Sequence, residues 1–87
     1  MKTIVLSKLP NQSFSFMRDN QRFNVTLNSR NGKTYLSYKI NRKNVLLNRL
    51  CVDRVDIDGI FMFEDTQGKE DPYYDGFNDR FKLRLLI

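Results

Sequence analysis

The sequence predicts an all-β protein, a small antiparallel β-barrel that is closed or partly open and built as a meander of about six to eight short strands. Along most of the chain, apolar side chains alternate with polar ones, as in half-buried strands. Short turn-forming segments separate these runs, and no stretch of ten residues has apolar side chains at helical spacing. Leu46–Val52 is the only place where a helical turn fits. We therefore expect residues 1–87 to form a single β-barrel domain.

The opening segment predicts two strands around a proline. Thr3–Leu6 is an apolar run, and Pro10 ends it because proline has no N–H for a sheet hydrogen bond. Phe14 and Phe16 then alternate with serines, and residues 18–21 have the composition of a turn.

The strongest turn signal is Asn31-Gly32, between alternating runs at residues 23–28 and 35–40. This dipeptide is typical of a type I′ hairpin, because both central residues of that turn need a positive φ. A second tight turn at residues 41–44 leads into a short apolar strand at residues 45–47.

The second half alternates less regularly. Leu50–Val55 fits either a short strand or a loop, and Asp58-Gly59 predicts a turn into a strand at Ile60–Phe63. Residues 66–78 are polar and predict a loop, and the last strand runs from Arg80 to Ile87.

The predicted core consists of the large apolar side chains on one face of each strand. They are Ile4, Leu6, Phe14, Phe16, Phe23, Val25, Leu27, Leu36, Tyr38, Ile40, Leu47, Phe61, Phe63, Phe81, Leu83 and Leu85. The one cysteine, Cys51, lies in an apolar run and is expected to be a buried, inert thiol. The fold therefore depends on packing, without an intrachain disulfide or a multi-cysteine metal site.

Charge is distributed unevenly along the chain, whose net charge is +5. Residues 1–50 carry ten Lys or Arg and one acid, Asp19, which makes +9; residues 51–87 carry five against nine acids, which makes −4. The two halves can pair within the chain, or the basic surface can dock on an acidic partner or on a copy of the same chain. A nucleic-acid binder would use the basic surface alone, and nine clustered acids argue against it.

The residue types argue against an enzyme and against a cofactor or metal site. The chain has no histidine, so the usual general base near neutral pH is absent. Asp53, Asp56 and Asp58 precede Gly59, but an EF-hand alignment would put Arg54 at the first calcium ligand. A hairpin turn is the better interpretation of this segment.

No targeting segment or membrane-spanning stretch is evident in the sequence. The first apolar run, Thr3–Leu6, is broken by Ser7 and Lys8 and is too short for a signal peptide. No run approaches the ~20 apolar residues that cross a bilayer. We expect a soluble protein that is made in the cytoplasm and has no membrane partner.

The two ends of the chain resemble a known family. Residues 1–16 combine an Ile- and Leu-rich run, Leu-Pro-Asn-Gln and alternating Phe, and residues 72–85 combine Pro-Tyr-Tyr with Arg-Phe-x-Leu-x-Leu. This pattern resembles the small baseplate plug proteins of tailed phages and prophages, over nearly the whole chain. The resemblance implies a β-barrel subunit in the virion tail baseplate, on the tube axis beside hub, spike and tube proteins. It also implies a homo-oligomer, for example a trimer around the axis, that is assembled in the host cytoplasm.

Three groups of residues are candidates for protein contact. Proline-anchored loops carry the first group, which is Pro10, Asn11, Tyr73 and Tyr74. The basic segment around the second tight turn carries the second, which is Lys39, Arg42 and Lys43. One face of the last strand carries the third, which is Arg80, Lys82 and Arg84. The tyrosines could instead cap the open end of a barrel, and the basic strand residues could serve solubility and protect an edge.

Two other functions fit the same residues. Basic and aromatic outer faces, such as Lys33, Tyr35 and Lys39, also occur in OB-like or Sm-like barrels that bind single-stranded nucleic acid. A regulatory or inhibitory module with one tight protein partner is the third possibility.

Overall fold

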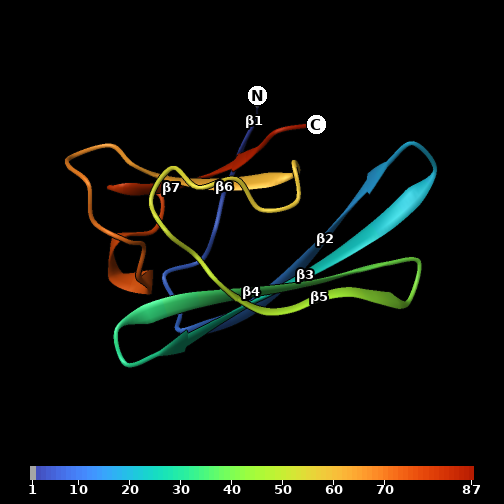
Figure 1. Cartoon of the computed structure of the whole chain (residues 1–87), viewed down its shortest axis with the longest axis horizontal. Coiled ribbons are helices and arrows are strands. Elements are labelled where there is room, and N and C mark those ends of the chain that lie inside the picture. The colour runs from blue at the N-terminus through green and yellow to red at the C-terminus, as the bar shows by residue number, and fades with distance from the viewer. Residues whose placement is uncertain (1) are drawn as a thin grey trace.

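The computed structural model describes residues 2–87 and is all-β, with seven strands and one short 3-10 helix in this range (Figure 1). The elements are β1 (Lys2–Ile4), β2 (Asn11–Arg18), β3 (Gln21–Arg30), β4 (Lys33–Ile40), β5 (Lys43–Leu50), β6 (Phe61–Asp65), η1 (Tyr74–Gly76) and β7 (Phe81–Leu85). The strands form two antiparallel sheets, ordered β1-β7-β6 and β2-β3-β4-β5. The prediction of an all-β fold is confirmed.

Three two-residue turns connect the strands of the four-stranded sheet. Both central residues have positive φ in Asp19-Asn20 (52° and 62°), Asn31-Gly32 (50° and 74°) and Asn41-Arg42 (49° and 72°). Positive φ at both positions matches the right-handed twist of the strands that a type I′ turn joins. The hairpin predicted at Asn31-Gly32 is therefore confirmed, and its register runs from Arg30–Lys33 to Phe23–Ile40.

The two sheets face each other but do not close into a ring. Within residues 2–87, no hydrogen-bonded ladder joins β1 to β2 or β5 to β6. Between β1 and β2, the Gln12 amide instead donates hydrogen bonds to the carbonyl oxygens of Ser7 and Leu9, at 2.6 and 3.1 Å. Between β5 and β6, residues 51–60 form turns that cross from one sheet to the other. The prediction allowed a closed or a partly open barrel, and the described residues do not form a closed one.

One core fills the space between the sheets, and most of its members were predicted. Val25, Leu36 and Phe61 are fully buried, and Phe14 and Phe16 pack against the core from β2. Leu47 is the exception, because 65% of it is exposed. Register shifts between β4 and β5 turn Leu46 toward the core in its place.

Some elements differ from the expectation in place or kind. Of the two alternatives for the segment after Leu50, the structure has the loop. Residues 46–50 belong to β5, so a helical turn there was a wrong prediction. The only helix in the described residues is η1, in the loop predicted at residues 66–78. Ile57 and Phe77, which come from loops, are 1% exposed and were missing from the predicted core.

Candidate interaction surface

Basic side chains gather where two hairpins of the four-stranded sheet end together. The backbone N–H of Asn41 donates to the Arg22 carbonyl oxygen, and the Arg22 N–H donates to the Asn41 side-chain oxygen, both at 2.9 Å. This pair of hydrogen bonds holds the β2–β3 turn beside the β4–β5 turn. We name the exposed cations of the two turns the basic end: Arg18, Arg22, Lys39, Arg42 and Lys43.

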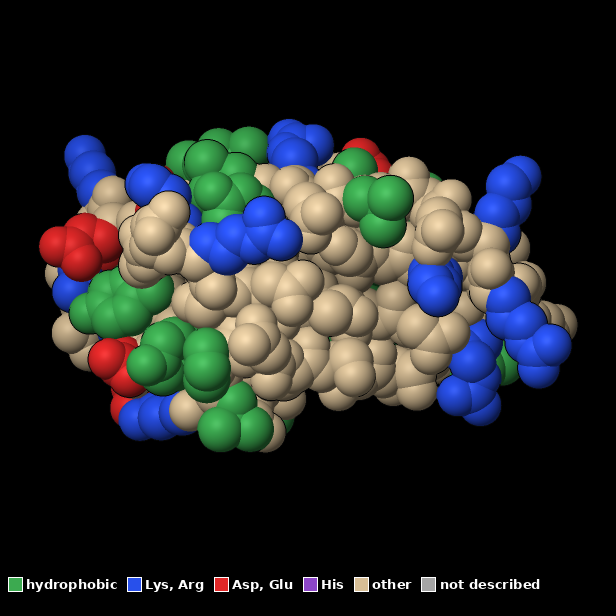
Figure 2. Space-filling model, turned by 90° about the horizontal axis from the view of Figure 1, so that it is seen from below, with side chains coloured by type: hydrophobic (Ala, Val, Ile, Leu, Met, Phe, Trp, Pro, Cys, Tyr) green, Lys and Arg blue, Asp and Glu red, His purple; other side chains and the backbone are tan. Residues whose placement is uncertain are grey.

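No ion pair among residues 2–87 neutralises the cations of the basic end. Among residues 2–87, the cations that form ion pairs are Lys8, Arg54, Arg80 and Arg84, and none belongs to the basic end. Figure 2 shows blue side chains gathered at the right end, with the visible red ones elsewhere. Asp19, the only acid in the first fifty residues, lies in the β2–β3 turn itself but forms no ion pair within residues 2–87, so five cations stand against one acid at this end. This end can therefore attract an acidic surface.

Pairing between the two halves of the chain does not account for the uneven charge. Lys8 with Asp79 is the single ion pair in the described residues that joins the basic half to the acidic half. Both of its side chains are more than half exposed, and such pairs contribute little to stability. The remaining ion pairs lie within residues 53–84.

Arg42 holds its charge in an unfavourable backbone conformation. Its φ of 72° is in the left-handed region, where the Cβ of a long side chain is crowded by the backbone. The equivalent position of the β3–β4 turn is Gly32, with φ 74°. Strain of this kind occurs preferentially at functional positions.

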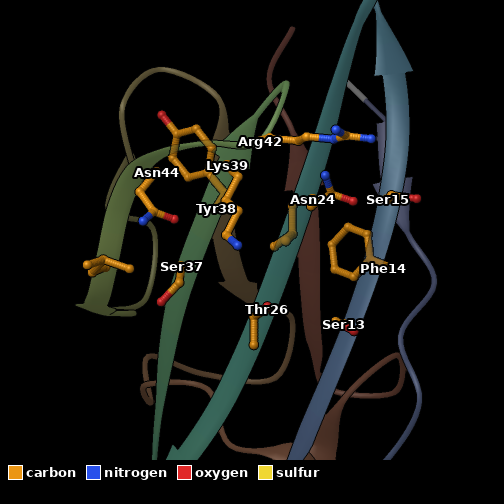
Figure 3. Close-up of a pocket in the computed structure, with 12 residues that line it drawn as sticks. Ser13, Phe14, Ser15, Asn24, Thr26, Ser37, Tyr38, Lys39, Arg42 and Asn44 are labelled. Atoms are coloured by element: carbon orange, nitrogen blue, oxygen red, sulfur yellow. The ribbon is translucent and has the colours of Figure 1, made fainter.

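A polar groove of about 480 Å³ runs across the outer face of the four-stranded sheet (Figure 3). Arg42 lies toward the upper end of the view, and Thr26 and Ser13 lie toward the lower end. The lining residues are Ser13, Phe14, Ser15, Asn24, Val25, Thr26, Ser37, Tyr38, Lys39, Arg42, Asn44 and Leu47. Hydroxyl and amide groups dominate the set, so this face is suited to hydrogen bonding with a polar surface.

The predicted basic face of the last strand is present, but its three cations are already bound to carboxylate and carbonyl groups of the same chain. Arg80 binds Asp65, and Arg84 donates to Glu64 at 2.9 and 3.1 Å and also to the Thr3 hydroxyl. Lys82 donates to the carbonyl oxygen of Asn78 at 2.7 Å. These three cations take part in holding the three-stranded sheet and its loops together.

The proline-anchored candidates lie in two different settings. Pro10 and Asn11 are exposed where the chain enters β2. Tyr73 and Tyr74 are half-buried against the core, and the Tyr73 ring lies 5.3 Å from the ring of Phe81. Each tyrosine thus has a structural contact as well as an exposed edge.

Sequence reasoning missed Arg18 and Arg22 as members of the basic end. They stand about twenty residues before Arg42 in the chain, and pairing of β3 with β4 brings the two turns together. The spacing of the turns at residues 19–20, 31–32 and 41–42 was the available signal. In a meander of strands of similar length, alternate turns lie at the same end of the sheet, so the first and third turns are neighbours.

The acidic residues before Gly59 accept hydrogen bonds from within the chain. Asp56 accepts a hydrogen bond from the N–H of Gly59 at 2.5 Å, and Asp58 accepts one from the Tyr38 hydroxyl at 2.8 Å. In residues 2–87, no three acidic or cysteine side chains are grouped closely enough to hold a metal ion. Burial raises the pKa of the Cys51 thiol to about 12, which keeps it protonated near neutral pH.

A family model described as the cyanophage baseplate Pam3 plug gp18 matches residues 1–86. The chain belongs to this family of baseplate plugs. The resemblance found in the sequence is thereby confirmed, and a search of curated proteins found no match. Family membership supports a structural role in a phage baseplate, implies a non-enzymatic function, and implies interaction with other tail proteins. In the described residues, no helix is long and apolar enough to span a membrane.

Proposed function

We propose that the chain is a plug on the tube axis of a tail baseplate and docks through its basic end on an acidic surface of a hub, spike or tube protein. The observation that carries this proposal is the excess of five exposed cations over one acid, Asp19, at one end of the molecule, where none of the cations forms an ion pair within residues 2–87. Complementary charge would guide the subunit to its place and set its orientation.

The polar outer face supports docking by many modest contacts rather than by one deep pocket. Small hydroxyl and amide side chains lose little entropy when a second surface covers them. Contacts of this kind would let neighbouring proteins hold the plug and release it when the baseplate rearranges.

We also propose that copies of the chain form a ring around the tube axis. We propose three copies, assembled in the host cytoplasm with their neighbours, because a subunit on a closed axis repeats with the symmetry of its surroundings.

A triple charge reversal tests the docking surface. Lys39→Glu, Arg42→Glu and Lys43→Glu together should deplete the chain from purified tail particles, counted by quantitative mass spectrometry against the hub proteins. The matched control reverses Arg30, Lys33 and Arg49, which are exposed and form no ion pair within residues 2–87. If both variants are depleted equally, or if neither is depleted, the basic end has no specific role in docking.

Single-stranded nucleic acid is a second candidate ligand, because Lys33, Tyr35 and Lys39 share the outer face of β4. Arg30 already lies over the Tyr35 ring, with its guanidinium carbon 5.9 Å from the ring centroid. Binding of a labelled oligonucleotide should fall steeply with salt if phosphates are bound. Such binding by a chain that is absent from tail particles would favour this second function over the plug.

A further inference from the structure

β1 and β2 border a seam where the two sheets separate. β1 pairs only with β7, and β2 pairs only with β3, so the facing edges of both strands have no partner strand among residues 2–87. Figure 1 shows the two strands diverging from the segment that connects them. A groove of about 370 Å³ lies between them, bordered by residues 2–5 and 14–18.

The walls of the seam are apolar. Phe14 and Phe16 are half-buried and pack against the core, and Ile4 does the same from β1. Val5 is 84% exposed and Met17 is 61% exposed. These two are among the most exposed large apolar side chains of the described residues, and both line this groove.

The other long edges of the two sheets are protected. Along β6, the carbonyl oxygens of Phe61 and Phe63 accept hydrogen bonds from the backbone N–H groups of Ile57 and Arg54, both at 2.8 Å. Along β5, register shifts and the left-handed Asn48, with φ 52°, break the regular edge. Covered and irregular edges are the usual means of preventing strand addition.

β2 lacks these devices over residues 13–18; at its start, the Gln12 side chain is hydrogen-bonded to the backbone of Ser7 and Leu9. The eight residues of β2 pair with β3 in one continuous register, from Asn11–Asn28 to Arg18–Gln21. Its only charged residue is Arg18, at the end of the strand. A long, regular and nearly uncharged edge is the kind that accepts an additional strand.

We propose that an extended segment of a neighbouring tail protein enters this seam, hydrogen-bonds to β2 as an additional strand, and closes the barrel. Apolar side chains at alternate positions of the segment would cover Phe14 and Phe16. A carboxylate at one end would meet Lys2 and Arg18, which line the groove at its end away from the β1–β2 connection and form no ion pair within residues 2–87. The assignment of the donor to a tail protein rests on the proposed function; the acceptor site itself does not.

A free arm fits this seam better than a folded second copy does. The groove is bordered on both sides, by β1 and by β2, so an entering strand must be free along both of its own edges. In residues 2–87, β2 is already paired with β3 along one edge, and so it cannot enter the seam of another copy as a separate strand.

Peptide binding to the purified chain tests the acceptor site. The probe is an eight-residue peptide in which valine alternates with threonine and an aspartate stands at one end; the comparison peptide has lysine at that end. We expect the aspartate peptide to bind at least tenfold more tightly and to slow amide hydrogen exchange in residues 11–18. Val5→Asp with Met17→Asp should abolish this binding. The matched control, Val45→Asp with Leu47→Asp, alters two exposed apolar residues of β5 and should leave it unchanged.

A photo-crosslinking residue in place of Met17 tests the donor in purified tail particles. A crosslink to an extended segment of another tail protein supports the proposal. A crosslink to a second copy overturns it. So does a Val5→Asp, Met17→Asp variant that enters particles in normal amount while the amides of β2 show no protection from hydrogen exchange. In either overturning case the chain is still present in the particles, so the plug function stands while the strand-acceptor role fails.

Discussion

Arg80 and Asp65 form a two-point ion pair, in which Nε and Nη2 of the arginine each lie 2.8 Å from a different oxygen of the carboxylate. The Asp65 side chain is buried, and its oxygens also accept the backbone N–H groups of Gln67 and Glu70, at 2.9 and 2.8 Å. One carboxylate thus ties the loop after β6 to Arg80, the residue immediately before β7. The hydrogen bonds from Arg80 hold the pKa of Asp65 well below its usual range.

Asp65→Asn should destabilise the chain more than any substitution of an exposed acid. The amide would present an NH₂ group to two of the four donors that the carboxylate accepts, and it would leave Arg80 without its charge partner. Glu70→Gln is the control, because Glu70 is exposed and lies 3.4 Å from Arg80. Urea unfolding should show a much lower midpoint for Asp65→Asn than for Glu70→Gln.

The same ion pair predicts a loss of stability in acid. The folded pKa of Asp65 is below the ordinary value of 3.8, so its contribution is complete above that pH and is lost as pH falls toward the folded value. Urea midpoints measured from pH 6 down to pH 2 should fall less steeply for Asp65→Asn than for the unmodified chain. Parallel curves would show that other carboxylates control acid unfolding.

Tyr38→Phe should lower stability by about 0.5–1.5 kcal/mol, the usual contribution of one hydrogen bond. The Tyr38 hydroxyl donates to the Asp58 carboxylate at 2.8 Å and connects β4 to the turn before β6. Burial, together with Asp58, raises the pKa of Tyr38 to about 12. Stability from this group is therefore complete below the unfolded value near 10 and is lost as pH rises toward 12. The variant should lack this alkaline loss in a urea series from pH 8 to pH 11.

Gly76→Ala should destabilise the chain by about 1–3 kcal/mol, as overpacking of a filled core does. A Cβ at this position would lie 2.6 Å from Cδ2 and 2.7 Å from Cε2 of Phe81, and the Phe81 ring is fully buried. Asp75→Ala is the control, since Asp75 is an exposed neighbour in the same 3-10 helix. A thermal midpoint for Gly76→Ala equal to that of the control would show that the ring moves aside without cost.

The sequence predicted those elements whose conformation depends on residues adjacent in the chain. Asn31-Gly32 identified its hairpin because a two-residue turn with positive φ at both positions is encoded by the turn itself. Ile57 and Phe77 were missed because loops carry them to the core through contacts distant in the chain. Leu47 was misplaced because a register shift reverses the alternation within β5.

The interaction surface was predictable only in part, for the same reason. The run from Lys39 to Lys43 is visible in the sequence, whereas Arg22 joins it through a hydrogen-bonded contact with Asn41. The seam between β1 and β2 has no local signal at all. The alternating pattern alone would allow β1 and β2 to pair. The seam exists because no hydrogen-bonded ladder joins them.

Arg42→Gly should separate the stability of the fold from the docking of the plug. Glycine adopts φ near 72° without strain, so the variant should be more stable by about 0.5–1 kcal/mol, after allowance for the greater entropy of glycine in the unfolded chain. Loss of one cation from the basic end should at the same time reduce the number of copies in purified tail particles. Asn20→Gly is the control, because Asn20 has φ 62° at the equivalent position of the β2–β3 turn and carries no charge. If Arg42→Gly is more stable and enters particles as well as Asn20→Gly does, the charge at this turn does not contribute to docking.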